Sequence, residues 1–279
     1  MALRELLRRQ PAVLGLLEHK LQADEPSSNL ARAALERIGD AHGYGCTWTF
    51  SPRKGLDGLV ALVRRDAGDS SSRMRIIVPA SEPRLTSDAC AHERRLLHLE
   101  FASLHLLLAY APNSGREGRL DFRLQQWEPS VRALLCRLAS TTNKPVLYQG
   151  DLNVAHDRAS DCWGETDAQW GGGKASGRTP AEQGALDTLL AECGMVDGFR
   201  ARPHAGDASA TCWHQKARGA PEQRAHWKRY DYALVSRALV DEAAPRGAGL
   251  QLVHVRHHAD AFCGGRPDHL PVESVFVFR

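Results

Sequence analysis

Val146-Leu-Tyr-Gln-Gly-Asp-Leu-Asn153 is an apolar segment that runs into a glycine, an acid and, two positions later, an amide. It predicts a buried strand that ends near Gly150. Residues two apart at a strand end project from the same side, so Asp151 and Asn153 are expected to point together from a sheet edge. A carboxylate there can orient or deprotonate a nucleophile, and an amide can stabilise a developing oxyanion. An Asx turn that ends the strand is the structural alternative.

Short apolar segments on both sides of this one predict further strands, several of them buried on both faces. The expected strands are Val13–Leu17, Cys46–Phe50, Leu59–Arg64, Arg75–Val78, Leu96–Phe101, His105–Tyr110, Val146–Asp151, Ala210–Trp213, Tyr230–Val235, Gln251–Val255 and Val272–Phe278. Helices are expected from a Ser27/Ser28 cap to about Ala41, from about Arg119 to Leu138, and from a Thr179–Glu182 capping box to Gly194. Strands with interspersed helices indicate an α/β protein with layered sheets.

The composition is that of an ordinary globular domain. The 279 residues are 43% hydrophobic and 25% charged, which argues against wholesale disorder. The formal net charge of +3 permits a nucleic-acid partner without establishing one. The chain contains no apolar run of ~20 residues and no secretory signal pattern, so we expect an intracellular, non-membrane protein. Seven cysteines without a C-x-x-C motif argue against a disulfide framework or zinc ribbon and favour reduced thiols.

Two acidic residues near the C-terminal strands can carry chemistry with a histidine. Asp268 and His269 are adjacent, and such a pair can provide a hard oxygen ligand for a cation and a proton donor for a phosphate. A polar loop is the alternative. Asp231 lies at the start of an otherwise apolar strand, where an acid needs a partner. An imidazole would be oriented by it, whereas pairing with Arg229 would make it a structural surface acid.

Two earlier segments add further polar groups. Glu18 follows an apolar strand and could coordinate Mg²⁺, although an ordinary strand-ending charge is the commoner meaning of such a residue. The segment Tyr110-Ala-Pro-Asn-Ser-Gly-Arg116 follows a hydrophobic strand and presents a phenol, the Asn113 amide and a guanidinium. All three are donors that proteins use toward phosphates.

These five signals, in this order, resemble the exonuclease III-type apurinic/apyrimidinic endonucleases of the endonuclease/exonuclease/phosphatase superfamily. The matching segments are Leu16-Leu-Glu-His-Lys20, Tyr110-Ala-Pro-Asn-Ser-Gly115, Gly150-Asp-Leu-Asn-Val-Ala155, Arg229-Tyr-Asp-Tyr232 and Pro267-Asp-His-Leu-Pro271. The basic turn Arg53-Lys-Gly-Leu-Asp-Gly58 is also similar to one that lies beside the DNA in this family. The resemblance extends over nearly the whole chain and implies one domain, residues 1–279.

The resemblance implies a four-layered α/β sandwich of two mixed β-sheets flanked by helices. It implies Mg²⁺-dependent hydrolysis of the DNA backbone 5′ to abasic sites, with 3′-exonuclease or 3′-phosphodiesterase activity in addition. The implied catalytic residues are Tyr110, Asp151, Asn153, Asp231 and His269. The implied metal-binding residues are Glu18, Asp151, Asn153, Asp268 and His269, with Mn²⁺ as a substitute for Mg²⁺.

The expected partner is double-stranded DNA with abasic sites, bound by a monomer that does not associate with membranes. The implied DNA-binding residues are Arg53, Lys54, Asn113, Arg116, Trp213, Trp227 and Tyr230. In a eukaryote the protein would be expected in the nucleus or a DNA-containing organelle. Cys212 stands where the family has an aromatic pocket residue.

The family's first strand, with its Asn-x-x-Gly-x-Arg motif, has no counterpart in this sequence, and weakened catalysis is therefore expected. Two other functions remain open: a catalytically weakened DNA-binding homologue, and a superfamily phosphatase that acts on another phosphate ester.

Overall fold

The computed structural model describes residues 2–68, 76–81, 85–162, 176–205, 210–213, 227–241, 249–258 and 268–278. Its strands are β1 Val13–Leu17, β2 Tyr44–Thr49, β3 Leu59–Arg64, β4 Ile76–Ser81, β5 Leu96–Phe101, β6 His105–Tyr110, β7 Val146–Asp151, β8 Met195–Asp197, β9 Cys212–Trp213, β10 Trp227–Lys228, β11 Asp231–Ser236, β12 Leu250–His257 and β13 Val272–Phe278. Its helices are α1 Ala2–Arg8, α2 Pro26–Ala41, α3 Asp88–Glu93, α4 Arg119–Phe122, α5 Glu128–Thr141, α6 Arg158–Asp161, α8 Pro180–Glu192 and α9 Gly198–Ala201. The shorter helical turns are η1 Arg65–Gly68, the π-helix η2 Arg123–Trp127 and η5 Arg237–Leu239.

Six of the described strands form a mixed sheet in the order β4-β5-β6-β7-β11-β8. Strands β6 and β7 are parallel, and the other neighbours are antiparallel. The second sheet layer consists of two antiparallel pieces, β1-β3-β2 and β12-β13. The expected α/β architecture of mixed sheet and flanking helices is therefore confirmed, with the second layer divided between two pieces.

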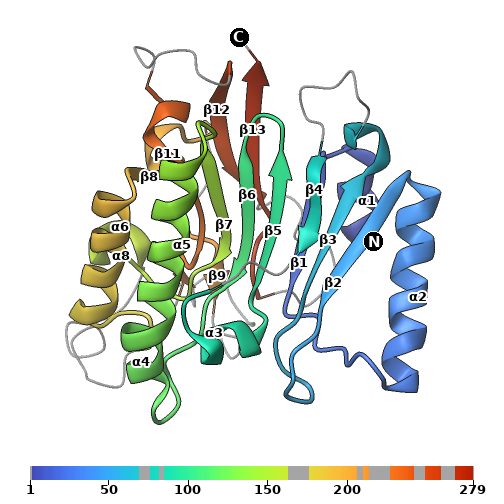
Figure 1. Cartoon of the computed structure of the whole chain (residues 1–279), viewed down its shortest axis with the longest axis horizontal. Helices are drawn as coiled ribbons and strands as arrows, with labels where there is room; N and C mark the ends of the chain where they lie inside the picture. The colour runs from blue at the N-terminus through green and yellow to red at the C-terminus, as the bar shows by residue number, and fades with distance from the viewer. Residues whose placement is uncertain are drawn as a thin grey trace.

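Alternation of side chains along the strands builds three hydrophobic cores between the layers. On β6, Leu107 and Ala109 face the helices, and Leu106 and Leu108 face the other sheet layer. On β3, Leu59 and Ala61 contribute to the core between the sheets, while Val60 and Leu62 pack with α1 and α2. Figure 1 shows α5 and α8 on one side of the strands and α2 on the other. Strands buried on both faces explain the continuously apolar segments of the sequence.

The register of the large sheet brings three polar side chains to one edge. Tyr110 and Asp151 are paired at the ends of the parallel strands β6 and β7. Asp231, the first residue of β11, pairs with Asp151 in the antiparallel direction. Three neighbouring strands therefore carry a polar residue at the same edge of the sheet: β6 and β7 end with one, and β11 begins with one.

The helix ends differ from expectation at one position. Thr179 and Glu182 form the expected capping box at the start of α8. The prediction of a Ser27/Ser28 cap for α2 was wrong, because Pro26 at the first helical position starts the helix and Glu25 occupies the N-cap. Ser28 is instead buried, where its hydroxyl accepts from the backbone N–H of Gln22 at 2.9 Å. The predicted helix from Arg119 to Leu138 is one helical run, α4-η2-α5, that continues to Thr141.

Cys136 of α5 and Cys193, at the end of α8, form a disulfide. The expectation of reduced thiols was wrong for this pair. The packing of α5 against α8 brings the two Cα atoms to 4.8 Å, which the number and spacing of cysteines in the sequence do not reveal. Cys46, Cys90, Cys162 and Cys212 are free thiols.

Within the described ranges, no helix has both the length and the apolar character needed to cross a membrane.

Gly150 is required by the close approach of β6 and β7. Its φ is +149°, and a Cβ atom there would lie 1.9 Å from the Ala109 carbonyl oxygen. We predict that Gly150→Ala lowers the free energy of unfolding by about 2–5 kcal/mol, through steric overlap and backbone strain. Gly184→Ala is the matched control, because a Cβ at this position of α8 meets no atom within 4 Å. It should stabilise the protein by about 0.5–1 kcal/mol. Equal unfolding midpoints in urea for the two variants would contradict this account of Gly150.

Candidate active site

Asp151 and Asn153 form a hydrogen-bonded unit at the end of β7. Asp151 Oδ1 accepts the Asn153 backbone N–H at 2.8 Å, and Oδ2 accepts the Asn153 side-chain amide at 3.1 Å. The same amide nitrogen donates to the Ala111 carbonyl at 3.0 Å, so Oδ1 of Asn153 faces away from Asp151. Asn153 has a φ of +50°, a left-handed conformation that asparagine tolerates better than most residues. The Asx turn is therefore present, and it orients the two side chains rather than replacing their chemical role.

Asp231 and His269 form the second unit of the site. His269 Nδ1 lies 2.7 Å from Asp231 Oδ2. Buried Thr211 links the segments that carry them: its Oγ1 accepts the Asp231 backbone N–H at 3.1 Å, and its carbonyl accepts the Leu270 N–H at 2.7 Å. Arg229 does not pair with Asp231; its guanidinium bonds Asp161 and Asp197 instead. The geometry thus favours the imidazole-orienting role of Asp231 over that of a surface acid.

Burial and neighbouring charges separate the proton affinities of the two units. Burial raises the pKa of Asp151 to about 7; the charge of Asp231 adds to this rise, whereas His269 opposes it. Burial lowers the pKa of His269, but the adjacent carboxylates outweigh it, above all the hydrogen-bonded Asp231, and raise the pKa to about 10. His269 is therefore a cation at neutral pH, beside an acid that titrates near neutrality. Perturbed pairs of this kind are typical of acid–base sites.

Glu18 and Tyr110 approach the site from the other sheet layer and from β6. The Tyr110 hydroxyl donates to Glu18 Oε1 at 3.1 Å, and Lys20 Nζ lies 3.5 Å from the same oxygen. Glu18 follows β1 with a φ of +58°, which turns it out of the strand direction. Burial raises the pKa of Tyr110, and the charges of Asp151 and Glu18 contribute to this rise. Tyr110 therefore lies between the two carboxylates and stays protonated as a donor.

The predicted basic turn is held by acidic partners. Arg53 Nη2 lies 3.3 Å from a carboxylate oxygen of Asp57 and 3.3 Å from one of Glu93. Both acids also bond Arg95, whose guanidinium carbon lies 5.0 Å from the centroid of the Tyr110 ring. This network joins the basic turn to the site. Exposed Lys54 forms an ion pair with Glu25 at 2.7 Å.

The other predicted DNA-binding residues occupy different positions around the site. The Asn113 amide donates to Asn153 Oδ1 at 3.1 Å, and Arg116 is exposed in the loop that follows. The Tyr230 hydroxyl donates to the Ser176 carbonyl at 3.0 Å. Trp227 is half-buried and pairs through its backbone with Trp213, whose side chain lies outside the described part of the structure.

The donor set fits a hard divalent cation held by few protein ligands. Within the described ranges, no three His, Cys, Asp or Glu side chains converge into a metal-binding cluster. Asp151 nevertheless presents a carboxylate whose burial is only partly compensated, and Glu18 presents another beyond Tyr110. Asp268 lies close enough to His269 to raise the pKa of the imidazole. Mg²⁺ is typically bound by one or two carboxylates with several waters, which suits oxygen donors spaced in this way.

Two buried groups around the site are absent from the residues singled out by the sequence: Arg123 and Thr211. Arg123 is held by the Leu152 and Asn153 carbonyls, each at 2.7 Å. It lies four residues before buried Trp127, so a charge on the apolar face of the predicted helix was the available signal. Thr211 carries no comparable signal, because its partners are distant in the sequence, and Arg229 was named only as a possible partner of Asp231.

The chain is similar in sequence to known nucleases. No protein-family model matches the chain. The chain is 33% identical over 152 residues to a DNA-(apurinic or apyrimidinic site) endonuclease of Dictyostelium discoideum, covering 54% of this chain and 39% of that protein. The chain therefore spans well under half the length of that relative. An exodeoxyribonuclease of Streptococcus pneumoniae is 28% identical over 277 residues, covering 97% of this chain and 88% of the relative.

A solved structure extends the match to the fold. The AP endonuclease LMAP from Leishmania major superposes with a TM-score of 0.73 at 24% identity, over 100% of this chain and 82% of that one. The chain is therefore similar in sequence to AP endonucleases and exodeoxyribonucleases, and it has the fold of an AP endonuclease.

Proposed function

We propose that the chain is a metal-dependent phosphodiesterase that hydrolyses the DNA backbone 5′ to abasic sites. The observation that carries the proposal is the pairing of two buried acids, Asp151 and Asp231, across adjacent strands, with His269 bonded to the second. In the proposed mechanism Asp151, with its pKa raised to about 7, acts as the base beside the imidazolium of His269, whose pKa is raised to about 10. A phosphodiester needs both: a group that accepts a proton from water, and donors for the charge that develops on phosphorus.

In this mechanism the chain's own residues activate water and stabilise charge. Asp151 accepts a proton from the attacking water as its oxygen bonds to phosphorus. The bond from phosphorus to the 3′ oxygen breaks and that oxygen takes a proton from solvent, which leaves a 3′-hydroxyl on one side and a 5′-phosphate on the abasic sugar. His269, oriented by Asp231, stabilises the charge on the phosphoryl oxygens, and the Asn153 amide holds Asp151 in position through its hydrogen bond. Tyr110 donates to the phosphate through its hydroxyl.

Glu18 and Asp151 would hold the divalent cation, with Asn153, Asp268 and His269 near enough to bind its waters or the phosphate. The chemistry that Mg²⁺ supplies when bound is positive charge beside the phosphoryl oxygens and the leaving group. Arg116, Lys54 and Arg53 would contact backbone phosphates without reading sequence, so affinity for DNA should fall with salt. Asn113, Trp213, Trp227 and Tyr230 would contribute contacts around the lesion.

An incision assay tests the proposal. The purified chain is incubated with an end-labelled abasic duplex and with the matched intact duplex, in Mg²⁺, Mn²⁺ or EDTA. We expect cleavage of the abasic strand only, with a 3′-hydroxyl end, in either metal and none in EDTA. Binding without cleavage would favour the weakened DNA-binding homologue. Release of phosphate from nucleotides or phosphoinositides without DNA cleavage would favour a phosphatase for another ester.

A 3′-exonuclease activity is the second candidate. The Streptococcus pneumoniae relative that matches nearly the whole chain is named an exodeoxyribonuclease. The same hydrolysis, applied to a terminal phosphodiester, would release nucleotides from a recessed 3′ end. Shortening of the intact duplex from its 3′ ends would support this activity.

His269→Ala should reduce incision by about 10²–10³-fold, the typical loss of one preorganised donor. Abasic-DNA affinity should change little, because the donor acts on charge that develops in the transition state. His42→Ala, after α2, is the matched control and should retain full activity. A folded His269→Ala protein with the wild-type turnover number would remove this histidine from the mechanism.

Glu18→Gln should raise the Mg²⁺ concentration needed for half-maximal rate, because it removes one charge while keeping the acceptor for Tyr110. High Mg²⁺ should partly restore the rate. Glu192→Gln, at the remote end of α8, should leave the Mg²⁺ dependence unchanged. A metal titration that superposes on the wild-type curve would exclude Glu18 as a ligand.

The pH dependence of kcat/KM should be bell-shaped, because Asp151 must be deprotonated and His269 protonated. In Asp231→Asn both limbs should move to lower pH. The lost negative charge no longer raises the pKa of Asp151, and it no longer raises the pKa of His269. Unchanged limbs in this variant would show that neither group is titrated in the rate profile.

A further inference from the structure

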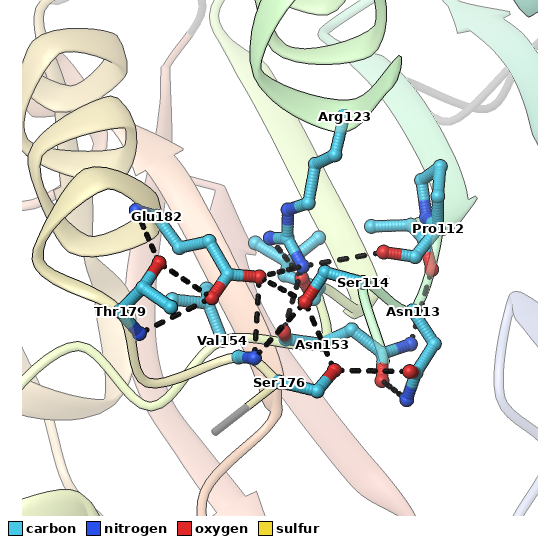
Figure 2. Close-up of polar contacts among 12 residues, drawn as sticks. Pro112, Asn113, Ser114, Arg123, Asn153, Val154, Ser176, Thr179 and Glu182 are labelled. Atoms are coloured by element: carbon cyan, nitrogen blue, oxygen red, sulfur yellow. Dashed lines mark hydrogen bonds and ion pairs between the residues drawn. The ribbon is translucent and has the colours of Figure 1, made fainter. Parts of the chain in front are cut away.

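Arg123 is buried directly beneath the polar end of β7. It lies in the π-helix η2, a local widening that recurs at functional sites, and it is 1% exposed. Its guanidinium donates to the Leu152 and Asn153 carbonyls at 2.7 Å each and to the Pro112 carbonyl at 3.3 Å. Figure 2 shows this side chain reaching down toward the segment that holds Asn153. Arg123 therefore binds the backbone carbonyl of Asn153, the residue whose φ lies in the left-handed region.

Glu182 is the second charged group under the site, and it is fully buried. Its two carboxylate oxygens face in different directions. Oε2 accepts from the backbone N–H of Thr179 at 3.2 Å and from its hydroxyl at 2.8 Å, which completes the helix cap. Oε1 accepts from the Ser114 hydroxyl at 2.6 Å and the Gly177 N–H at 3.1 Å, and it lies 3.5 Å from Arg123 Nη1. Oε2 therefore completes the N-terminal cap of α8, and Oε1 fixes the position of Ser114 in the loop after β6.

Polar contacts lead from Glu182 through Ser114, Ser176 and Asn113 to Asn153 (Figure 2), and Asn153 in turn donates to the catalytic carboxylate. The Ser176 hydroxyl lies 2.9 Å from both Ser114 Oγ and Asn113 Oδ1. The Asn113 amide donates to Asn153 Oδ1 at 3.1 Å, and the Asn153 amide donates to Asp151 at 3.1 Å. Each amide oxygen therefore accepts from the donor before it in the chain, and this sets the direction in which the amide nitrogen points.

We propose that the Arg123–Glu182 pair is a positioning element that sets the orientation of Asn113 and Asn153 for the reaction. The proposal rests on the proposed function and adds two residues that touch no substrate. Arg123 holds the Asn153 backbone, and Glu182 Oε1 holds Ser114 and so the Asn113 amide. A small displacement of the Asn153 amide would move the Asp151 carboxylate to which it is bonded, and this would weaken transition-state stabilisation more than ground-state binding.

The two oxygens of Glu182 allow its capping and positioning roles to be separated. Ser114→Ala removes only the branch toward the site, and Ser114→Thr keeps its hydroxyl. Thr179→Ala removes only the side-chain part of the helix cap. Glu182→Gln removes the negative charge beside Arg123 and places an amide nitrogen against N–H or O–H donors in one of the two branches.

We expect Ser114→Ala and Glu182→Gln to lower kcat by about 10–10²-fold, with DNA affinity within about threefold of wild type, since misplacement of ~1 Å can cost 10²-fold in rate. Ser114→Thr should restore most of the rate. Thr179→Ala should lower the unfolding midpoint at least as much as Ser114→Ala does, yet keep the wild-type kcat. A loss of kcat that follows the unfolding midpoint across all four variants would overturn the proposal.

Hydrogen exchange measured by mass spectrometry tests the positioning without activity. Ser114→Ala and Glu182→Gln should accelerate exchange in residues 111–116 and 152–155, where the Gly115 N–H is bonded to Asn113 and the Asn153 N–H to Asp151. Thr179→Ala should accelerate exchange only at the start of α8. Unchanged exchange in both segments would overturn the proposal. A wild-type chain that leaves abasic DNA uncut would instead overturn the proposed function, and the exchange data would still decide the positioning role.

Discussion

The structure depends on the burial of two carboxylates that face each other across an antiparallel strand pair. Asp151 and Asp231 are register partners, and each is less than a tenth exposed. Two buried like charges at this spacing repel, so one must be protonated or an opposite charge must lie between them. His269 supplies that charge through its bond to Asp231, and the Asn153 backbone and amide stabilise the other acid. Removing any of these groups would leave a buried charge without compensation, which is more unfavourable than the lost bond itself.

The surrounding fold holds this charge arrangement rigidly. Parallel β6 and β7 end at Tyr110 and Asp151, and this alignment is possible because Gly150 lets the two backbones approach. Thr211 connects the segments that carry Asp231 and His269. Buried Arg123 bonds the Asn153 carbonyl and lies beside Glu182, and buried Arg229 forms an ion pair with Asp161. The apolar cores on both faces of the sheet exclude water from the floor of the site, which strengthens each of these interactions.

The sequence was sufficient to identify the segments that carry the site, because its polar groups lie at the ends of apolar segments. Asp151, Asn153, Tyr110 and the Asp231–His269 pair were all predicted, and the structure brings them together. Contacts between distant segments could not be predicted. The capping box identified Glu182, but only the packing of α8 against the Ser114 loop shows where its second oxygen points. The Cys136–Cys193 pair and the Asp161 and Asp197 partners of Arg229 depend in the same way on tertiary packing.

The central claim is that a permanent imidazolium at His269 balances the buried acids, and NMR titration of its ring tests this most directly. The ¹⁵N shifts of His269 in the metal-free protein, assigned by comparison with His269→Ala, report the charge of the ring at each pH. Because the surrounding carboxylates raise the pKa of His269 to about 10, the ring should remain doubly protonated from pH 6 to pH 9. In Asp231→Asn the titration should move to lower pH. A ring that loses its proton near pH 6.5 with Asp231 intact would contradict the account.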